Sequence, residues 1–278
     1  MKRVLALPLM LLATATPTAR TDAGVIRTVY FSAVDAKGVH VTDLSAADLT
    51  VKEGGKERAI EAVRPATALM QVSLLVDDAG TGGFQAAVAQ FVQATFGRAE
   101  IAIRVLNPQA IKVMDFTRNG DDMRTALGRL GRRGSVSVDG EQIIAGVADA
   151  ARELQQRRAP RGSIVALTIS GEKPAADQAD DALNALRSSG ASLSVLYLTT
   201  TELGRVLGDG PKQSGGIIER VNGHLVVGPG IAKIADNLLN QYVLTYTIPD
   251  GVKPNEKLSL STSRSGVKLI APARLPDK

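Results

Sequence analysis

The sequence predicts an α/β protein in which a mostly parallel central sheet, flanked by helices, is accompanied by a small β-rich unit. Between Gln71 and about Gln241, short apolar runs alternate with segments whose apolar residues recur at helical spacing. Such alternation is typical of a parallel sheet that is covered on both faces. On either side of this region, apolar and polar residues alternate one by one, as they do in half-buried strands. We therefore expect two structural units.

The first 23 residues predict a signal peptide and a short leader. Met1-Lys2-Arg3 is followed by the apolar run from Val4 to Leu12 and by Ala13-Thr14-Ala15, which is the charged, apolar and small-residue order of an export signal. The alternative is a buried N-terminal helix. The run is too short to span a bilayer, and no other stretch approaches the roughly 20 apolar residues that a membrane helix needs. The chain has no cysteine, so neither disulfides nor thiolate chemistry is available. We expect a soluble periplasmic or secreted protein.

Residues 24–66 form the expected N-terminal β-rich segment. Apolar alternation begins at Val25 and is followed by a turn at Asp35-Ala36-Lys37-Gly38. Ser45 is a candidate helix cap because an acid, Asp48, follows three residues later. The string Val51-Lys52-Glu53-Gly54-Gly55-Lys56 predicts a strand that enters a tight hairpin.

Residues 67–241 form the expected α/β domain, and residues 242–278 form a second β segment. Each β-rich end is too short to bury a sheet face alone, so we expect the two ends to pack together. The predicted buried strands of the α/β domain are Val72–Val76, Ile101–Leu106, Ile164–Ile169 and Leu193–Leu198.

An acidic, glycine-rich turn follows the first of these strands. Asp77 and Asp78 precede Ala79-Gly80-Thr81-Gly82, and a helical pattern comes next. Ligands bind at the carboxyl ends of parallel strands, so this turn is the candidate site. Two adjacent carboxylates are costly to bury without partners, so we expect both to be exposed at the strand tip.

Three strings in order resemble the secreted bacterial proteins that carry a von Willebrand factor type A (VWFA)-related domain. They are the segment from Asp35 to Lys56, which includes Val-Thr-Asp-Leu-Ser-Ala-Ala-Asp-Leu-Thr-Val-Lys-Glu-Gly-Gly-Lys, the strand that ends at Asp77, and Asn240-Gln241-Tyr242-Val243-Leu244-Thr245-Tyr246. The resemblance covers the whole mature chain. It implies a Rossmann-like α/β domain flanked by β segments. It also implies a metal-ion-dependent adhesion site made of Asp-x-Ser-x-Ser, a threonine on a second loop and an aspartate after a later strand.

The implied metal site is degenerate in this sequence. Asp77 matches the motif, but Ala79 replaces its first serine and Thr81 its second. The second loop, around Asp139 and Glu141, offers acids but no threonine. Ser170 stands where the family has the later aspartate. Since Mg²⁺ needs near-octahedral oxygen coordination, we expect no bound cofactor, with weak Mg²⁺ binding through Asp139 or Glu141 as the alternative. The candidate partner-binding rim comprises Asp77, Asp78, Thr81, Asp139, Glu141 and Ser170.

Other chemistries have little support. The net charge of +5 includes Lys2 and Arg3 of the leader, and aromatic residues make up 3% with no Trp, so nucleic-acid binding is not expected. The turn lacks the full G-x-G-x-x-G spacing of a dinucleotide site. The histidines, His40 and His224, belong to different segments, and no G-x-S-x-G motif of a serine hydrolase is present.

Two arginine clusters lie at the ends of helical segments. A solvated face is the expectation for both, and an anionic partner is the alternative. The clusters are Arg129, Arg132 and Arg133, and Arg152, Arg157, Arg158 and Arg161.

The sequence therefore favours an exported, non-enzymatic protein-binding or adhesion-type module that uses the strand-tip face around Asp77. No catalytic residue is assigned, and the partner is an unidentified extracytoplasmic protein. One alternative is a hydrolase or nucleotide-dependent enzyme that uses the rim of Asp77 and Asp78. The other is an inert structural envelope protein.

Overall fold

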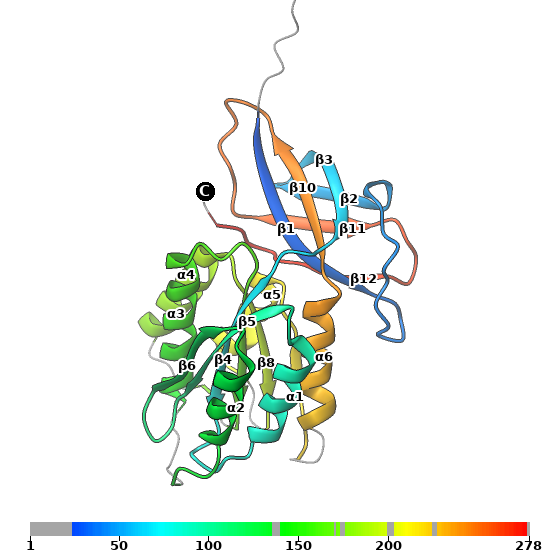
Figure 1. The fold of residues 1–278 in the computed structure, drawn as a ribbon. Helices are drawn as coiled ribbons and strands as arrows, with labels where there is room; N and C mark the ends of the chain where they lie inside the picture. Colours follow the sequence, from blue (N-terminus) through cyan, green and yellow to red (C-terminus); the bar gives the residue numbers. More distant parts are fainter. Residues whose placement is uncertain are drawn as a thin grey trace, which may run out of the picture.

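The computed structural model describes residues 24–134, 140–169, 171–172, 176–198, 203–223 and 227–276. Two sheets of six strands each organise these residues into an α/β unit and a β-rich unit, which lie end to end (Figure 1). The predicted signal peptide lies outside the described residues.

The α/β unit has the strand order β6-β5-β4-β7-β8-β9. All its strand pairs are parallel except β5 with β6, which is antiparallel. The chain leaves β4 for β5 on one side and returns to β7 on the other, as in a doubly wound fold. The predicted α/β fold with a mostly parallel sheet is confirmed. The strands are β4 (Met70–Asp77), β5 (Ala99–Val105), β6 (Ile111–Thr117), β7 (Gly162–Thr168), β8 (Ser192–Tyr197) and β9 (Ile218–Arg220).

Helices cover both faces of this sheet. Successive side chains of a strand point to opposite faces, so Leu74 packs with α1, α2 and α6, while Leu75 packs with α3, α4 and α5. None of the described helices is long and apolar enough to cross a bilayer. The helices are α1 (Gln85–Thr95), α2 (Gly120–Gly128), α3 (Glu141–Gln156), α4 (Ala176–Ser189), α5 (Arg205–Ser214) and α6 (Val227–Leu239).

The β-rich unit combines both ends of the chain, as predicted. Its antiparallel sheet has the order β11-β2-β3-β10-β1-β12, and β1 pairs with β10 so that Val29 lies opposite Leu244. The rings of Phe31 and Tyr242 stack in its core with centroids 5.3 Å apart. The strands are β1 (Val25–Val34), β2 (Leu49–Glu53), β3 (Lys56–Pro65), β10 (Tyr242–Ile248), β11 (Leu258–Thr262) and β12 (Lys268–Ile270), with a short 3-10 helix, η1 (Ala46–Asp48), before β2.

Local signals in this unit have the expected structural outcome. Gly54 and Gly55 have φ angles of 57° and 78°, which is the left-handed pair that a two-residue hairpin requires. The backbone N–H of Ser45 donates to Asp48 Oδ2 at 2.8 Å, so the predicted capping pair forms at η1.

Arg161 links the two units at their junction. Its Nε donates to Gln241 Oε1 at 3.0 Å, and its terminal nitrogens donate to the carbonyl oxygens of Ala66 at 3.3 Å, of Ala68 at 3.1 Å and of Leu238. Burial lowers the pKa of Arg161 to about 10, so the guanidinium stays charged at neutral pH. The expectation that Arg161 belongs to a solvated face is wrong, because both chain connections between the units present carbonyl oxygens to it.

The C-terminal segment 271–276 makes a second link. The N–H of Ala273 donates to the carbonyl of Gln213 on α5 at 3.0 Å, and the carbonyl of Ala273 accepts from the N–H of Leu258 on β11 at 3.0 Å. The β-rich unit is therefore hydrogen-bonded to α5 through the backbone.

Candidate functional site

The candidate site lies where the strand order of the α/β unit reverses. Asp77 ends β4 and Thr168 ends the neighbouring β7, while Asn107 follows β5 on the other side of β4. In open α/β sheets the crevice at this switch point is where ligands bind.

Asp77 is buried at this position, with 2% of its surface exposed. Thr168 Oγ1 donates to Asp77 Oδ2 at 2.7 Å, and Asn107 Nδ2 donates to Asp77 Oδ1. Hydrogen bonds of this kind offset the loss of hydration that makes a buried carboxylate costly. The expectation that Asp77 is exposed is wrong, because β7 and the segment after β5 each supply a donor to its carboxylate.

Asp78 is fully buried and pairs with an arginine. Arg133 donates to Asp78 Oδ1 at 2.6 Å, and the backbone N–H of Gly80 donates to the same oxygen at 3.1 Å. Arg133 also donates to the carbonyl oxygens of Leu130 at 2.7 Å and Gly131 at 2.9 Å. The predicted exposure of Asp78 is wrong as well, because an arginine 55 residues away neutralises its charge.

One further contact joins these two sets of hydrogen bonds into a single network, which we call the polar ring. Arg133 Nε approaches the carbonyl oxygen of Asn107 at 3.4 Å and so connects the pair at Asp78 with the hydrogen bonds at Asp77. The polar ring consists of Asp77, Asp78, Asn107, Arg133 and Thr168.

The glycines of the turn allow the loop that carries Arg133 to approach closely. Gly80 has a φ angle of 74°, and a Cβ there would lie 2.1 Å from the carbonyl oxygen of Gly134. The N–H of Arg133 donates to the carbonyl of Gly80 at 2.8 Å. Ala79, which replaces the first serine of the family motif, has a φ angle of 54°, uncommon for a residue other than glycine. The glycine-rich turn therefore allows the loop that carries Arg133 to pack closely against it.

The rest of the predicted rim is only partly described. Thr81 is exposed, and its Oγ1 donates to the carbonyl of Asp78 at 2.7 Å and accepts from the N–H of Gly83 at 3.2 Å. Glu141 is the first residue of α3, with an exposed side chain. Asp139 and Ser170 lie outside the described residues.

The described donor set does not fit a divalent cation. Both oxygens of Asp77 already accept hydrogen bonds, and the carboxylate of Asp78 is paired with the guanidinium of Arg133. A divalent cation next to Asp78 would be repelled by the positive charge of Arg133. Across the described ranges, no group of three or more His, Cys, Asp or Glu residues gathers to hold a metal ion.

A mainly apolar hollow lies beside the acidic turn. It has a volume of about 450 Å³, and Ile169 and Leu198 contribute half-buried side chains to it. Thr81, Gly82 and Gly83 complete the lining. The hollow is therefore an accessible surface next to a charged, hydrogen-bonded site.

Glu172 has a structural role at the start of α5. Its two carboxylate oxygens accept from the backbone N–H groups of Val206 at 2.8 Å and Leu207 at 2.7 Å. Burial raises the pKa of Glu172, and these two hydrogen bonds offset only part of the rise. Glu172 satisfies backbone donors that a helix start otherwise leaves unpaired.

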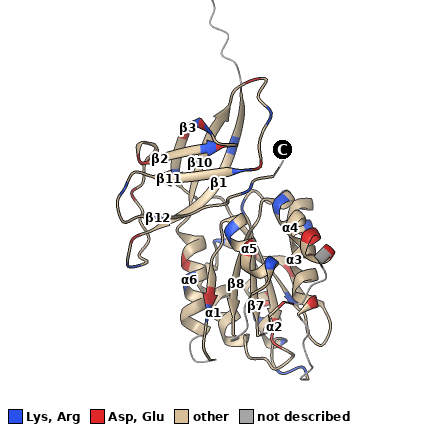
Figure 2. Ribbon diagram, turned by 180° about the vertical axis from the view of Figure 1, so that it is seen from behind, with Lys and Arg blue, Asp and Glu red and all other residues tan. Residues whose placement is uncertain are grey.

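Two of the four arginines of the second cluster pair with acids. Arg152 pairs with Asp149 at 3.4 Å and also with Asp181, and Arg157 pairs with Glu100 at 3.0 Å. Basic and acidic segments are interspersed over both units (Figure 2).

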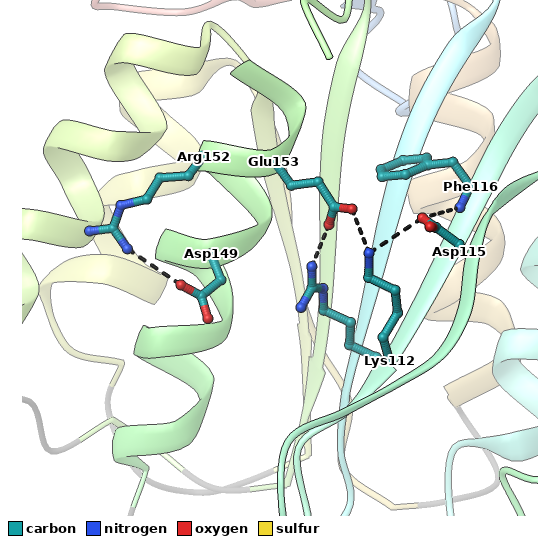
Figure 3. A network of polar contacts seen from close by, with 7 residues as sticks. Lys112, Asp115, Phe116, Asp149, Arg152 and Glu153 are labelled. Atoms are coloured by element: carbon teal, nitrogen blue, oxygen red, sulfur yellow. Dashed lines mark hydrogen bonds and ion pairs between the residues drawn. The ribbon is translucent and has the colours of Figure 1, made fainter. Parts of the chain in front are cut away.

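Glu153, the next residue of α3, points away from Arg152 and takes part in a separate set of ion pairs (Figure 3). Lys112 Nζ lies 2.7 Å from Glu153 Oε1 and 3.4 Å from Asp115 Oδ1. Burial by itself would raise the pKa of Glu153, but hydrogen bonds from Lys112 and Arg104 outweigh burial and lower it. This surface is an ion-pair network.

Arg133 is a member of the polar ring that sequence reasoning missed, because it was expected on a solvated face. The available signal was its position between Gly131 and Gly134, in a segment that follows α2. Glycines on both sides allow a close backbone approach, and the acidic turn needed a positive charge.

No protein-family model matches the chain, and no curated protein sequence matches it at the level required for significance. Several solved structures are similar in fold. The VWA domain of SpRpn10 has a TM-score of 0.47 and 11% identity, over 59% of this chain and 94% of that domain. An aerotolerance-related membrane protein from Bacteroides fragilis has a TM-score of 0.46 and 15% identity, over 62% of this chain and 98% of that one. A von Willebrand factor type A protein from Catenulispora acidiphila has a TM-score of 0.45 and 10% identity, over 94% of this chain and 76% of that one. These similarities concern the course of the chain and assign no role to any residue.

Proposed function

We propose that the protein is a non-enzymatic VWFA-type binding module that holds a protein partner on its strand-tip face without a metal ion. The observation that carries the proposal is the ion pair between Arg133 and the buried Asp78 at the switch point of the sheet. In a metal-dependent adhesion site, a divalent cation would supply the positive charge. Here a side chain of the protein itself supplies it.

The composition of the polar ring supports a binding role over a catalytic one. Its two carboxylates are buried: both oxygens of Asp77 accept hydrogen bonds and Asp78 Oδ1 pairs with Arg133, so a substrate on the surface has little access to either group. Among the described residues the one histidine, His40, belongs to the β-rich unit. The hydroxyl that lies beside a carboxylate in the ring, that of Thr168, is fully buried and so is not presented to a substrate.

The hollow beside the turn supports a protein as the ligand. Half-buried Ile169 and Leu198 offer apolar surface, and exposed Thr81 lies at its border. An apolar side chain of a partner that enters such a hollow would be desolvated next to a rigid polar rim. This is the arrangement of an interface anchor.

Affinity capture with matched variants tests the proposed face. The full chain is immobilised and exposed to envelope extract of its native host, in Mg²⁺ and in EDTA. We expect the same partner on the wild type under both conditions, and its loss from Thr81→Glu, which places a charge at the hollow. Thr28→Glu is the control, because it introduces the same change at an exposed position of β1. A partner that Thr81→Glu retains, or that EDTA releases, would contradict the proposal.

Calorimetry tests the absence of metal dependence directly. Because Arg133 already neutralises Asp78, we expect Mg²⁺ to bind the free protein more weakly than about 1 mM. Micromolar affinity that Asp77→Ala abolishes would restore metal-dependent adhesion as the mechanism.

The proposal places the protein in the periplasm or outside the cell. It rests on the order of charged, apolar and small residues from Met1 to Ala15. N-terminal sequencing of protein from the native host should find a shortened chain, with cleavage after Ala15, Ala19 or Ala23. Intact protein that begins at Met1 in the cytoplasm would exclude export.

A further inference from the structure

A second cleft lies between the two units, away from the polar ring. It has a volume of about 640 Å³ and is lined by the end of β1 and the turn after it, by α5, β9 and α6, and by β12. Asn237, in the last turn of α6, contributes to it. Helices that follow parallel strands run back along them, so this end of α6 is remote from the strand tips. The cleft has the size of a small-molecule site and lies at a junction of units, where such sites are common.

Asn237, in the wall of this cleft, has an unused hydrogen-bond donor beneath the surface. The residue is 2% exposed, and its Oδ1 accepts from Ser32 Oγ. Its Nδ2 has no acceptor within the described part of the chain and is shielded from solvent. Buried amide groups are normally hydrogen-bonded, so a rotation of this side chain toward the cleft would be stabilised by a ligand that carries an acceptor.

The charges around the cleft favour an anionic acceptor. Four lysines and two carboxylates line it, which leaves an excess of positive charge. Lys233 is paired with Glu219 at 3.1 Å, and Lys212 lies 3.9 Å from Asp209, which is a loose contact. Asp236 is the carboxylate that opposes an anion. The side chains of Lys37, Lys212 and Lys268 are exposed and come from three different segments.

His40 adds a second buried nitrogen to the same lining. Its Nδ1 has no hydrogen-bond partner among the residues that the structure describes. Apolar side chains form much of the remaining wall, including Ile217, Ile218 and Ile270. A ligand that fits both the positive charge and the apolar wall of the cleft has a charged oxygen group and an apolar body.

We propose that this cleft binds a small organic oxyanion, a carboxylate or a phosphate monoester with an apolar body. The ammonium groups of Lys37, Lys212 and Lys268 attract the anionic oxygens, and one of these oxygens accepts from Asn237 Nδ2 once that side chain has turned toward the cleft. The isoleucines pack against the apolar body.

Calorimetric titrations of the full chain with benzoate, phenyl phosphate and benzyl alcohol test this assignment. The three probes share a ring, and the first two distinguish a carboxylate from a phosphate. We expect benzoate or phenyl phosphate to bind at least about tenfold more tightly than benzyl alcohol, a ratio that charge recognition by a lysine-lined site supplies. Equal binding of the alcohol, or no binding of either anion, would overturn the proposal.

Variants then localise the binding. Asn237→Asp keeps the acceptor for Ser32 Oγ but replaces the donor by a negative charge, so we expect about a tenfold or larger loss of anion affinity. Lys268→Glu, at an exposed position, should weaken binding without unfolding the protein and decides the matter if Asn237→Asp does not fold. Lys253→Glu makes the same change at an exposed position outside the cleft and should leave the affinity unchanged. Anion binding that survives both Asn237→Asp and Lys268→Glu would place the ligand elsewhere.

Discussion

The polar ring and a second buried cluster, in the β-rich unit, use the same chemistry for different ends. In the ring, fully buried Asp78 pairs with Arg133 at 2.6 Å. In the β-rich unit, fully buried Glu53 pairs with Arg27 at 3.4 Å and accepts from Tyr246 Oη at 2.7 Å. Burial and the neighbouring carboxylate raise the pKa of that tyrosine.

The difference lies in access. The side chain of Arg27 is 5% exposed, whereas that of Arg133 is 16% exposed. The Glu53 cluster is enclosed between strands, so it only stabilises that unit. The polar ring lies at the end of a sheet beside a hollow, and Arg133 is its one partly exposed member. A buried carboxylate with an arginine partner therefore indicates a functional site only where its position allows contact with a ligand.

The largest effect is expected at the enclosed cluster. Glu53→Ala removes the acceptor for Tyr246 and leaves the buried guanidinium of Arg27 without this carboxylate, so we expect the free energy of unfolding to fall by about 3–5 kcal/mol. Glu53→Gln, the control, keeps an acceptor and the side-chain volume and should cost less. Chemical denaturation followed by circular dichroism measures both. Equal losses for the two variants would mean that packing, and not the acceptor, matters at this position.

Loss of Arg133 should cost somewhat less. Arg133→Met leaves the buried carboxylate of Asp78 without its counter-charge, and we expect a loss of about 3 kcal/mol because the arginine is partly solvated. The double variant Asp78→Asn/Arg133→Met removes both charges and should be more stable than Arg133→Met alone. If the double variant is the less stable of the two, Arg133 acts mainly through its hydrogen bonds to the backbone.

A smaller effect is expected at Asp77. Asp77→Asn removes the negative charge that strengthens the hydrogen bonds from Asn107 and Thr168, so we expect a loss of about 1–2 kcal/mol. Thr168→Val removes one of these two donors and should cost a similar amount. An aspartate exposed as the sequence predicted would leave the melting temperature of Asp77→Asn unchanged. Such a result would contradict the burial of Asp77 described above.

The smallest effect is a pH dependence at Glu172, a half-buried carboxylate that pairs with backbone N–H groups instead of an arginine. Its folded-state pKa is raised above the ordinary value of 4.5, chiefly by burial. Its contribution to stability is therefore full below pH 4.5 and is lost as the pH rises through the folded pKa. Relative to Glu172→Gln, the wild type should lose stability as the pH rises from about 4.5 to 7. Parallel melting curves across this range would show that Glu172 does not titrate differently in the folded state.

Several elements were predictable because local patterns determine them. The buried strands around Leu74 and Ile164 are continuous apolar runs, and the Gly54-Gly55 hairpin needs two left-handed residues. Other elements escaped prediction, among them an edge strand and a helix. Edge strand β6 (Ile111–Thr117) is partly polar, and α5 (Arg205–Ser214) contains Pro211. The helix forms because Val206 and Leu207 are buried and Glu172 satisfies its first N–H groups.

The sequence by itself determined the strand-helix alternation, the pairing of the two β-rich ends and the position of an acidic turn at a strand tip. Only the tertiary structure decided whether that turn is exposed. The partners of Asp77 and Asp78 lie 30, 55 and 91 residues away, at Asn107, Arg133 and Thr168. The cost of burying a carboxylate depends on the donors that surround it in space, and local spacing along the chain carries no information about donors that the fold brings from so far away.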